Sequence, residues 1–424
     1  MTGAKPLPFY TMNDFPLGGA TVLVRLDVNS PINPIDGTFL DDTRVREHLP
    51  TLRDLAGSKA VVLAHQSKAG KEDYTTLREH ARVIGNLVRR PTKYVDDLFG
   101  SRAIGEIRAM KDGEIVVLEN TRFYAEEELL ANKPFDAQAR AHIVRKLAPE
   151  VDYYLNDAYA AAHRSQPTLV GFTRVLPSMG GRLLEKEIAA IERALHSGEH
   201  PAVAVLGGAK VDDSIAVMKN MLKVGTIDTV LTGGVVANIA LAASGVELGA
   251  ASEAFLEKDV PTWRNLVEDT KAIMKDRPGA IKVPTDVVVN TKGHRVGIKA
   301  NALPSPDPIF DIGLDTMIEY DRVIQGAKVI LANGPMGVFE LEEFAVGTRG
   351  IMDAIARSQA FKVVGGGHTA ALVAQLGMAG KIDHVSTGGG ALISHLGGEP
   401  MPVLLALAES KKLHLDGKIK HRRA

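Results

Sequence analysis

The sequence has no cysteine among its 424 residues, which excludes thiol catalysis, disulfide bonds and thiolate metal sites. It has no run of about 18 apolar residues, so no transmembrane helix is expected. Its first residues lack the charged-then-apolar pattern of a secretion signal. The net charge is only −1, so no overall basic field attracts nucleic acid or an anionic membrane. These absences favour a cytoplasmic enzyme, although the composition alone does not separate it from a solute-binding protein.

Two domains are expected because 424 residues exceed what one hydrophobic core usually supports. Glycine marks the change between them, since 11 of the 41 glycines fall in the first 178 residues and 30 in the remaining 246. At this change, apolar residues recur at steps of three and four from Leu184 to Leu195 and predict a connecting helix. Gly180 and Gly181 precede it and are interpreted as its flexible end, a hinge. The predicted parts are an N-terminal domain (1–178), the connector (179–198), a C-terminal domain (199–397) and a final segment (398–424) that can return to the N-terminal domain.

Short apolar runs alternate with helical patterns through both halves. The clearest runs of the first half are TVLVRLDVNSP (21–31), AVVLAHQSKAG (60–70), EIVVLENTRFY (114–124) and DYYLNDAYAAAHRS (152–165). This alternation predicts an α/β fold: two Rossmann-like three-layer (αβα) domains with parallel sheets, joined by a helix and facing each other across a cleft. In such sheets, ligands bind beyond the carboxyl ends of the strands.

The residues that follow these four runs share one chemistry. Arginine suits phosphate or carboxylate because its planar fork donates two parallel hydrogen bonds. A single arginine at a strand end is more often a solvated charge, but the repetition predicts a shared site for a small anion. The residues concerned are Asp27, Asn29, His65, Lys68, Arg122, His163 and Arg164, joined by Arg44 from the start of the next helix.

The second half replaces these cations with glycine. Five segments, at 202–214, 226–238, 328–340, 361–371 and 384–392, are each predicted as a strand, glycines and a helix. Glycine lets a phosphate approach the backbone, and a helix N-terminus offers free N–H groups and a partial positive charge. An anion pocket and a phosphate cradle together suit phosphoryl transfer between two bound substrates. Because no general base is evident, an acceptor carboxylate, already ionised at neutral pH, is favoured over a hydroxyl.

From about Val22 to about Gly397 the chain resembles phosphoglycerate kinase. The motifs that carry the resemblance are VRLDVNSP, DDTRVR, LENTRF, NDAYAAAHR, LGGAKV, NGPMGVFE and VSTGGGA, and the DAYAAAHRSQPT and GGGHT forms are most similar to archaeal members. The resemblance implies reversible phosphoryl transfer between ATP and the carboxylate of 3-phosphoglycerate, giving ADP and 1,3-bisphosphoglycerate in glycolysis and gluconeogenesis. The implied cofactors are ATP/ADP and Mg²⁺.

The resemblance also implies the site residues. Those acting on the transferring phosphoryl group would be Arg44, Lys210 and Gly388. Those binding the acid substrate would be Asp27, Val28, Asn29, Arg44, His65, Gln66, Ser67, Lys68, Arg122 and Arg164. Those binding the nucleotide would be Gly208, Ala209, Lys210, Gly233, Gly234, Asn333, Pro335, Gly337, Glu340, Gly366, Gly367, His368 and Thr369.

Three departures from the family pattern stand out. The usual HxGR is HQSK here, so Ser67 replaces a glycine and Lys68 an arginine, which loses the bidentate fork. Ser214 stands where many members carry a second lysine, and His368 replaces the usual aspartate, a nucleotide-metal partner. Imidazole is a poor ligand for Mg²⁺, so the protein ligands of the metal are unknown, and nucleotide phosphates and waters are expected to hold it near residues 212–213. Ser214 removes a positive charge and His368 removes a negative one, and we hypothesise that these two losses compensate each other.

Other interpretations stay open from the sequence. A kinase of the same architecture acting on another phosphorylated acid, such as 2-phosphoglycerate, is the main alternative, and a non-enzymatic anion-binding protein is a weaker one. A dinucleotide dehydrogenase would need the full glycine fingerprint. The expected partners are small-molecule substrates, with no nucleic acid and no membrane, and a monomer is favoured over an oligomer.

Overall fold

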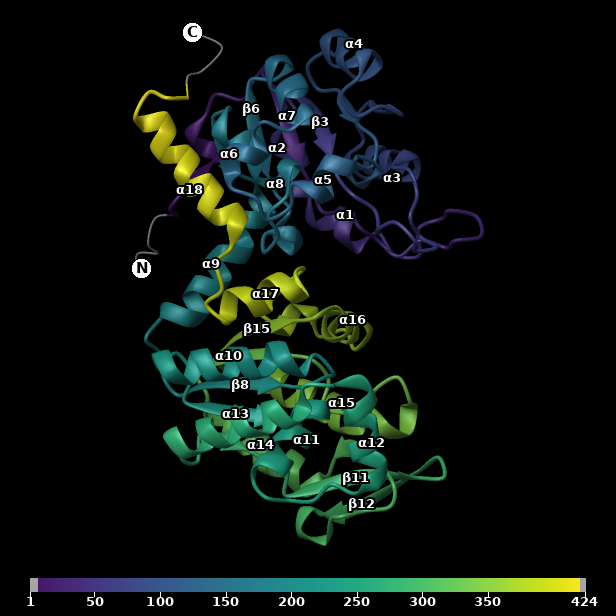
Figure 1. Ribbon diagram of the computed structural model, residues 1–424, viewed down its shortest axis with the longest axis vertical. Helices are drawn as coiled ribbons and strands as arrows, with labels where there is room; N and C mark the ends of the chain where they lie inside the picture. The colour runs from purple at the N-terminus through teal and green to yellow at the C-terminus, as the bar shows by residue number, and fades with distance from the viewer. Residues whose placement is uncertain (1–6, 420–424) are drawn as a thin grey trace. The chain divides into compact units, whose positions relative to one another are not determined.

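The computed structural model describes residues 7–419, which divide into two compact units. Unit 1 contains the chain up to Ala189 together with the residues from Pro400 onward, and unit 2 contains Ala190–Glu399 (Figure 1). The last residues of the basic tail, 420–424, lie outside the described part. The boundary between the units falls inside helix α9 (Arg182–His196).

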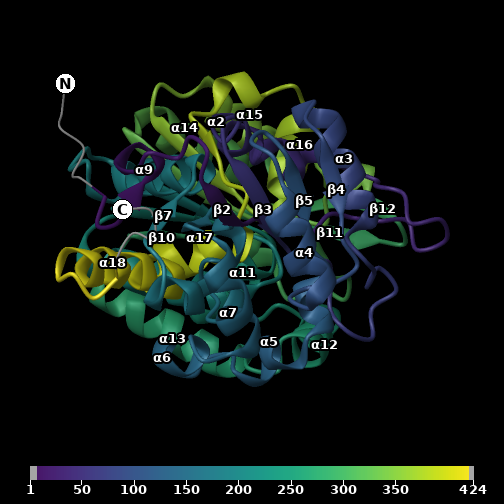
Figure 2. The ribbon, with the colours of Figure 1, turned by 90° about the horizontal axis from the view of Figure 1, so that it is seen from above.

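Unit 1 is built on a seven-stranded sheet in which every pairing of the described residues is parallel. The four predicted runs form contiguous strands, and Figure 2 shows β2, β3 and β5 side by side. In spatial order the strands are β1 (Tyr10–Thr11), β7 (Ser178–Gly180), β6 (Tyr153–Asn156), β2 (Thr21–Arg25), β3 (Lys59–Leu63), β5 (Ile115–Val117) and β4 (Thr92–Tyr94). The prediction of a parallel sheet is confirmed.

Apolar side chains cover both faces of this sheet, because successive residues of a strand point to opposite faces. Val22 and Val24 belong to one core cluster, and Leu23 between them belongs to the other. All three are completely buried, which explains the uninterrupted apolar runs in the sequence. The helices of this part are α1 (Thr43–Glu47), α2 (Leu49–Asp54), α3 (Arg78–Val88), α4 (Ser101–Ala109), α5 (Ala125–Leu129), α6 (Phe135–Gln138), α7 (His142–Leu147) and α8 (Pro167–Val170).

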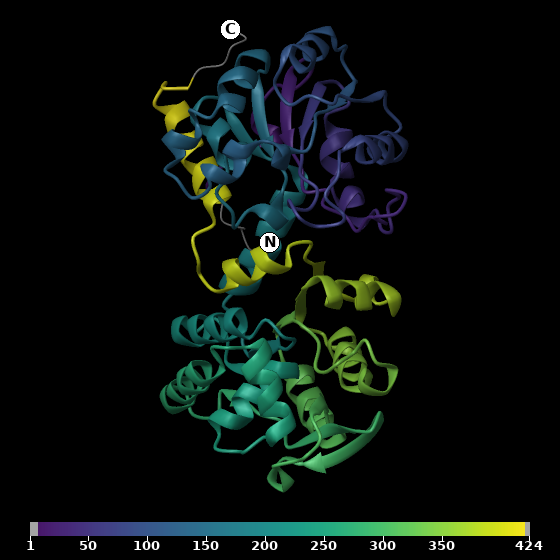
Figure 3. The same ribbon diagram turned by 45° about the vertical axis from the view of Figure 1, so that its right-hand side comes forward.

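The last helix, α18 (Pro402–Leu415), belongs to unit 1 although it follows unit 2 in the chain. The Val403 N–H donates to the Ala162 carbonyl at 3.2 Å, and the Ser410 hydroxyl donates to the Leu176 carbonyl at 3.3 Å. Figure 3 shows α18 lying along one side of unit 1. The core of unit 1 is therefore completed by the end of the chain.

The start of α9 is held tightly by unit 1. The Oδ1 atom of Asp157 accepts the Leu183 N–H at 2.9 Å, satisfying a donor that a helix N-terminus otherwise leaves free. A Cβ on Gly180 would lie 2.7 Å from the ring of Phe9, and a Cβ on Gly181 would lie 2.3 Å from Asp157. These two glycines are therefore required by close packing, and their interpretation as a flexible end stays a prediction.

Unit 2 is built on a six-stranded sheet that is also parallel in every described pairing. In spatial order its strands are β10 (Ile281–Lys282), β9 (Thr229–Thr232), β8 (Ala202–Leu206), β14 (Val329–Asn333), β15 (Phe361–Gly365) and β16 (His384–Val385). Its helices are α10 (Val211–Val224), α11 (Gly234–Ala243), α12 (Ala250–Asp259), α13 (Trp263–Asp276), α14 (Leu314–Gly326), α15 (Val346–Arg357), α16 (Gly367–Gln375) and α17 (Gly389–Leu396). Of the five predicted glycine turns, the one after β14 differs, because a loop follows it and α15 begins only at Val346.

A small antiparallel sheet in unit 2 is absent from the sequence-based expectations. It consists of β12 (His294–Lys299), β11 (Asp286–Thr291) and β13 (Ile309–Ile312). Strand β12 is mostly exposed and polar, so its sequence has no apolar run to reveal it. No helix in the described range 7–419 combines the length and the apolar character needed to cross a membrane.

Candidate active site

The predicted anion-binding residues lie at one edge of the unit 1 sheet. Strands β6, β2, β3 and β5 are neighbours and parallel, so their carboxyl ends meet at the same edge. Asp27 follows β2, His65 follows β3, Arg122 follows β5 and Arg164 follows β6. Arg44, from the first turn of α1, contacts Asp27. The topology thus gathers residues that are far apart in the sequence.

Asp27 is the acidic centre of this cluster. Its Oδ2 atom lies 3.3 Å from Nη1 of Arg44, and its Oδ1 atom accepts the Asn29 N–H at 3.2 Å. Burial alone would raise the pKa of this carboxyl, but the neighbouring positive charges, that of Arg44 above all, hold the pKa well below its usual range. Asp27 is therefore a carboxylate at neutral pH and can accept a hydroxyl hydrogen bond.

His65 is buried and neutral. The Nη2 atom of Arg25 lies 3.2 Å from Nδ1 of His65. A guanidinium only donates, so Nδ1 accepts and the ring proton is on Nε2. Burial, followed by the positive charges of Arg25 and Arg122, holds the pKa of His65 well below its usual range against the attraction of Asp27. His65 thus offers an anion a neutral N–H donor and no positive charge.

Arg25 is a site residue that the sequence analysis missed. It is completely buried at the end of β2, and its Nε donates to the Thr168 hydroxyl at 3.2 Å. The same hydroxyl donates to the buried carboxylate of Glu127. Burial raises the pKa of Glu127 while the charge of Arg25 opposes that shift. The sequence does contain a signal for Arg25, because it is a charged residue in an otherwise apolar strand. Burying a charge costs free energy unless the charge is paired.

Ser67 explains one departure from the family pattern. Its φ of 55° lies in the left-handed region, where glycine is normally preferred. The Ser67 N–H donates to Oδ1 of Asn29 at 2.8 Å, its hydroxyl donates to Asp73 at 2.5 Å, and its carbonyl accepts a hydrogen bond from Arg122. These three bonds hold a serine in a strained conformation. The next residue, Lys68, is exposed.

Two predicted substrate residues direct their side chains into the protein. Val28 is completely buried in the core. The amide nitrogen of Gln66 donates to the Ser30 carbonyl at 3.0 Å, and its Oε1 atom lies 3.0 Å from Nε2 of His80. Both side chains support the loops of the site, so only their backbones can contact a ligand.

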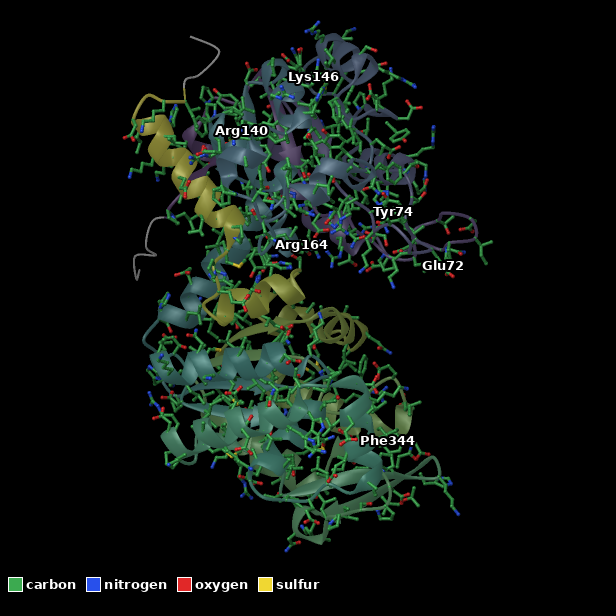
Figure 4. All side chains as sticks on the ribbon, viewed as in Figure 1. Glu72, Tyr74, Arg140, Lys146, Arg164 and Phe344 are labelled. Atoms are coloured by element: carbon green, nitrogen blue, oxygen red, sulfur yellow. The ribbon has the colours of Figure 1, made fainter. Side chains whose placement is uncertain are left out.

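Guanidinium groups outnumber carboxylates at this edge. Arg122 lies 3.3 Å from the exposed Glu128. Burial, and then the charge of Arg122, lower the pKa of Arg164, which is labelled in Figure 4. Arg44 also lowers it, so the three arginines share one region. Their excess positive charge suits a ligand with a phosphate and a carboxylate.

Unit 2 contains a cavity of about 770 Å³, a size typical of small-molecule sites. Gly233 and Gly388 directly precede two lining residues, Gly234 and Gly389. Gly367 and His368 begin α16, and their side-chain positions lie outside the described structure. The predicted nucleotide-binding residues that line the cavity are Gly208, Ala209, Lys210, Gly234, Asn333, Pro335, Gly337, Glu340, Gly366 and Thr369.

One end of this cavity is polar. Lys210 is the one lysine or arginine among the described lining residues. Asn333 is buried, and no described residue bonds its Oδ1 atom. The Thr369 hydroxyl accepts the Gly334 N–H at 3.2 Å. Helices α16 and α17 begin beside these residues, and helix N-termini attract phosphate.

The N-terminus of α11, which begins beside Gly208, is closed to phosphate. The Gly234 N–H donates to the Met336 carbonyl at 2.7 Å, and the Val235 N–H donates to the Gly208 carbonyl at 3.2 Å. Gly234 has a φ of 54°, and a Cβ there would lie 2.8 Å from the Gly208 nitrogen, so glycine is required. Lining residues that no motif revealed are mostly apolar and include Asn238, Ala251, Phe255, Pro284, Pro308 and Ile309.

Two carboxylates at or near the cavity, those of Asp311 and Asp212, are already engaged. Asp311 accepts hydrogen bonds from Arg295 at 2.7 Å and from the Gly347 N–H at 2.8 Å. Asp212 accepts the Thr262 hydroxyl at 2.7 Å. Within the described ranges, no three His, Asp or Glu residues group as metal ligands.

Comparisons with known proteins all indicate one family. The family profile described as Phosphoglycerate kinase matches residues 12–399. The phosphoglycerate kinases of Thermoplasma acidophilum and Methanothermobacter thermautotrophicus are 47% and 49% identical over 405 residues, covering 96% and 95% of this chain and 98% and 97% of those proteins. The crystal structure of phosphoglycerate kinase from Pyrococcus horikoshii OT3 is similar with a TM-score of 0.88 and 44% identity, covering 95% of this chain and 99% of that one. This chain therefore belongs to the phosphoglycerate kinase family.

Proposed function

We propose that the protein transfers a phosphoryl group reversibly between ATP and the carboxylate of 3-phosphoglycerate, with unit 1 binding the acid and unit 2 the nucleotide. The observation that carries this proposal is the cluster of Asp27, Arg44, His65, Arg122 and Arg164 at one sheet edge. Family membership supports the same reaction and favours it over another phosphorylated acid.

Each unit 1 residue has a role that its surroundings support. The Asp27 carboxylate accepts the substrate hydroxyl, and the Nε2–H of His65 donates to substrate oxygen. Arg122 and Arg164 neutralise phosphate and carboxylate charge. Arg44, which is partly exposed beside Asp27, neutralises the acceptor carboxylate and the moving phosphoryl group. The acceptor is already ionised at neutral pH, so no general base is required.

In unit 2, Lys210 and the N-termini of α16 and α17 would bind the nucleotide phosphates. Gly388 directly precedes α17; its N–H donates to the Ser386 hydroxyl at 3.3 Å, and the lack of a side chain would let the transferring group approach the start of that helix. Phosphoryl transfer depends mainly on positioning and on charge neutralisation, so these groups suffice without covalent catalysis. The reaction requires the acid and the nucleotide to meet, and water to be excluded at that moment.

Magnesium fits this site as a component of the nucleotide substrate. Mg²⁺ prefers oxygen ligands and commonly keeps several waters while binding phosphates. Asp311 and Asp212 already accept hydrogen bonds from the protein, which leaves the exposed Glu340 as a lining carboxylate. We propose that Mg²⁺ is held by the phosphates and water and supplies charge neutralisation there.

The experiment is a coupled assay of ATP consumption with 3-phosphoglycerate, with 2-phosphoglycerate as the alternative acid, with and without Mg²⁺. Arg44→Ala should lower kcat by roughly 100-fold or more while the affinity for ADP stays nearly unchanged. Arg46→Ala is the matched control, because Arg46 lies two residues away and pairs with the partly exposed Asp42. Turnover absent with both acids, or equal loss in the two variants, would contradict the proposal.

Three further expectations are proposals of the same kind. A monomer and a cytoplasmic location are supported by the sequence composition, and light scattering and cell fractionation test them.

Ser214 is completely buried in α10, one turn after Lys210. The proposed compensation between Ser214 and His368 is tested by restoring lysine and aspartate singly and together, because additive effects on kcat/KM would show that the two positions are independent.

A further inference from the structure

The loop of residues 68–76 lies between β3 and α3 and packs against the segment that carries Arg122. Its backbone makes two tight turns: the Lys71 N–H donates to the Lys68 carbonyl, and the Tyr74 N–H donates to the Lys71 carbonyl, both at 3.1 Å. Lys68 is the one residue of this loop that the sequence analysis expected at the substrate, and it is exposed. Two contacts with the anion site come instead from the second turn.

The first contact joins Asp73 to Ser67. The Ser67 hydroxyl donates to Oδ1 of Asp73 at 2.5 Å. The Ser67 backbone lies in the left-handed region, which is strained for serine and unstrained for glycine. Glycine, the usual residue of the family pattern, would adopt this conformation more easily but has no hydroxyl. The hydrogen bond to Asp73 is therefore what serine adds at this position.

This first contact acts on Arg122 through the backbone of Ser67. The Ser67 carbonyl accepts a hydrogen bond from Nη1 of Arg122, so the direction of that carbonyl helps to set the position of the guanidinium. The bond to Asp73 fixes the Ser67 side chain, and the small left-handed region then leaves the carbonyl a narrow range of directions. Arg122 keeps other N–H groups for a ligand, because a guanidinium has five.

The second contact joins Tyr74, labelled in Figure 4, to the backbone of Arg122. The Tyr74 hydroxyl donates to the Arg122 carbonyl at 2.6 Å, and its ring meets that of Phe123 edge to face, with the centroids 4.9 Å apart. Burial raises the pKa of Tyr74, while the charge of Arg122 opposes that shift. The hydroxyl is therefore protonated and able to donate at neutral pH. Arg122 is thus held at its carbonyl as well as at its guanidinium.

We propose that Asp73 and Tyr74 are positioning residues for the acid substrate, which hold Arg122 where its guanidinium binds an anionic group of that substrate. This inference rests on the proposed function and deepens it. A guanidinium makes paired hydrogen bonds with phosphate or carboxylate only when its plane is correctly oriented. A free arginine side chain loses rotamer freedom when it binds, so contacts that fix Arg122 in advance raise the affinity for the anion.

The charge of Asp73 has the opposite effect on the substrate from its position. A carboxylate repels an anion, so charge alone predicts that Asp73→Ala and Asp73→Asn both strengthen binding. A positioning role predicts that Asp73→Ala weakens binding. It also predicts that Asp73→Asn retains binding, because the amide keeps an oxygen that accepts the Ser67 hydroxyl. The two substitutions therefore distinguish the two effects.

The experiment measures KM for 3-phosphoglycerate and for ATP in the full-length protein. Asp73→Ala should raise KM for 3-phosphoglycerate by about tenfold, the value of one hydrogen bond, and leave KM for ATP unchanged. Asp73→Asn should stay close to the wild type. Tyr74→Phe, which keeps the ring and loses the hydroxyl, should raise the same KM by a few-fold. Glu72→Ala is the matched control, because Glu72 is the exposed carboxylate next to Asp73 (Figure 4), and it should behave like the wild type.

The route through Ser67 and Arg122 is tested by combining substitutions. Ser67→Ala should match Asp73→Ala, and the double variant should be no worse than either, because both remove the same hydrogen bond. In an Arg122→Ala background, Asp73→Ala should change kcat/KM for 3-phosphoglycerate much less than it does in the wild type. Additive losses in either combination would overturn the proposal.

Three outcomes separate the possible failures. If the wild type converts 3-phosphoglycerate and Asp73→Ala has an unchanged or lower KM for it, the inference is overturned and the proposed function stands. Equal increases of KM for 3-phosphoglycerate and for ATP in Asp73→Ala, with a lower Tm, would show a merely structural role and overturn the inference as well. Failure of the wild type to convert 3-phosphoglycerate would overturn both.

Discussion

The Nη2 atom of Arg25 lies 3.2 Å from Nδ1 of His65, and this contact fixes the histidine tautomer. His65 was expected from its position after β3, but its protonation could not be deduced from that position. The contact with Arg25 leaves the ring proton of His65 on Nε2, so His65 donates through that atom. The buried arginine therefore acts as a positioning residue for His65.

The tautomer predicts different effects for two amide replacements of His65. The glutamine amide nitrogen occupies roughly the place of Nε2, whereas that of asparagine occupies the place of Nδ1. His65→Gln should keep KM for 3-phosphoglycerate within a few-fold, and His65→Asn should raise it by about tenfold through loss of a hydrogen bond. The KM for ATP is the internal control. If both variants lose the same affinity, Nε2 is not the donor.

Protonation of His80 should destabilise the protein in acid. Burial lowers the pKa of His80 to about 4, while the unfolded chain titrates near 6.5. Between these two pH values the unfolded state binds more protons than the folded state. The free energy of unfolding is therefore highest above pH 6.5 and falls by about 3 kcal/mol in total as the pH drops toward 4. His80→Gln keeps a donor for Gln66 and should lack this pH dependence. Denaturant unfolding of both proteins at several pH values measures the difference. The same pH dependence of the unfolding free energy in the wild type and in His80→Gln would refute this prediction.

Arg295 should stabilise unit 2 through the buried Asp311. Their side chains are 24% and 0% exposed and lie 2.7 Å apart. Arg295→Leu should cost about 3 kcal/mol, because it leaves a buried carboxylate without its partner. Adding Asp311→Asn should recover part of this loss. Lys219→Met, which breaks an exposed pair with Asp269, should cost less than about 1 kcal/mol. Similar losses for the buried and exposed pairs, followed in urea unfolding, would contradict this account.

Gly181 and Gly198 lie before and after the connecting helix and provide a matched pair. Gly181→Ala would place a Cβ 2.3 Å from Asp157 and should cost about 3 kcal/mol by overpacking. Gly198 has a φ of 70° but nothing within 4 Å of its Cβ position, so Gly198→Ala should cost about 1 kcal/mol, the strain alone. Calorimetric Tm values compare them. A flexible start of α9 would instead tolerate alanine at Gly181.

The sequence predicted the parts of the fold that have a local signature. The buried strands β2, β3, β5 and β6 appear as apolar runs because both faces of each strand are covered. Strand β12 has no such run, because it is exposed and polar. The packing of Gly181 against Asp157 was also hidden, since glycine in a sequence indicates freedom and close approach equally well.

The same limit applies to the sites. Motifs identified Asp27, Arg44 and Lys210, whose roles depend on their own chemistry. Arg25 was missed because its role depends on what surrounds it, since it is a charge buried in the core and held by Thr168. Gln66 was expected at the ligand but is used by Ser30 and His80.

The packing of α18 on unit 1 determines the order in which the two units of the nascent chain can finish folding. Val403, Ala406 and Leu407 are completely buried there, and Arg174 pairs with Glu409 at 2.7 Å. A ribosome that adds about 5–20 residues per second needs about 10–40 s to make the intervening Ala190–Glu399. Throughout that time unit 1 lacks a piece of its core. The half of the protein that is synthesised first is therefore the half that can finish folding last.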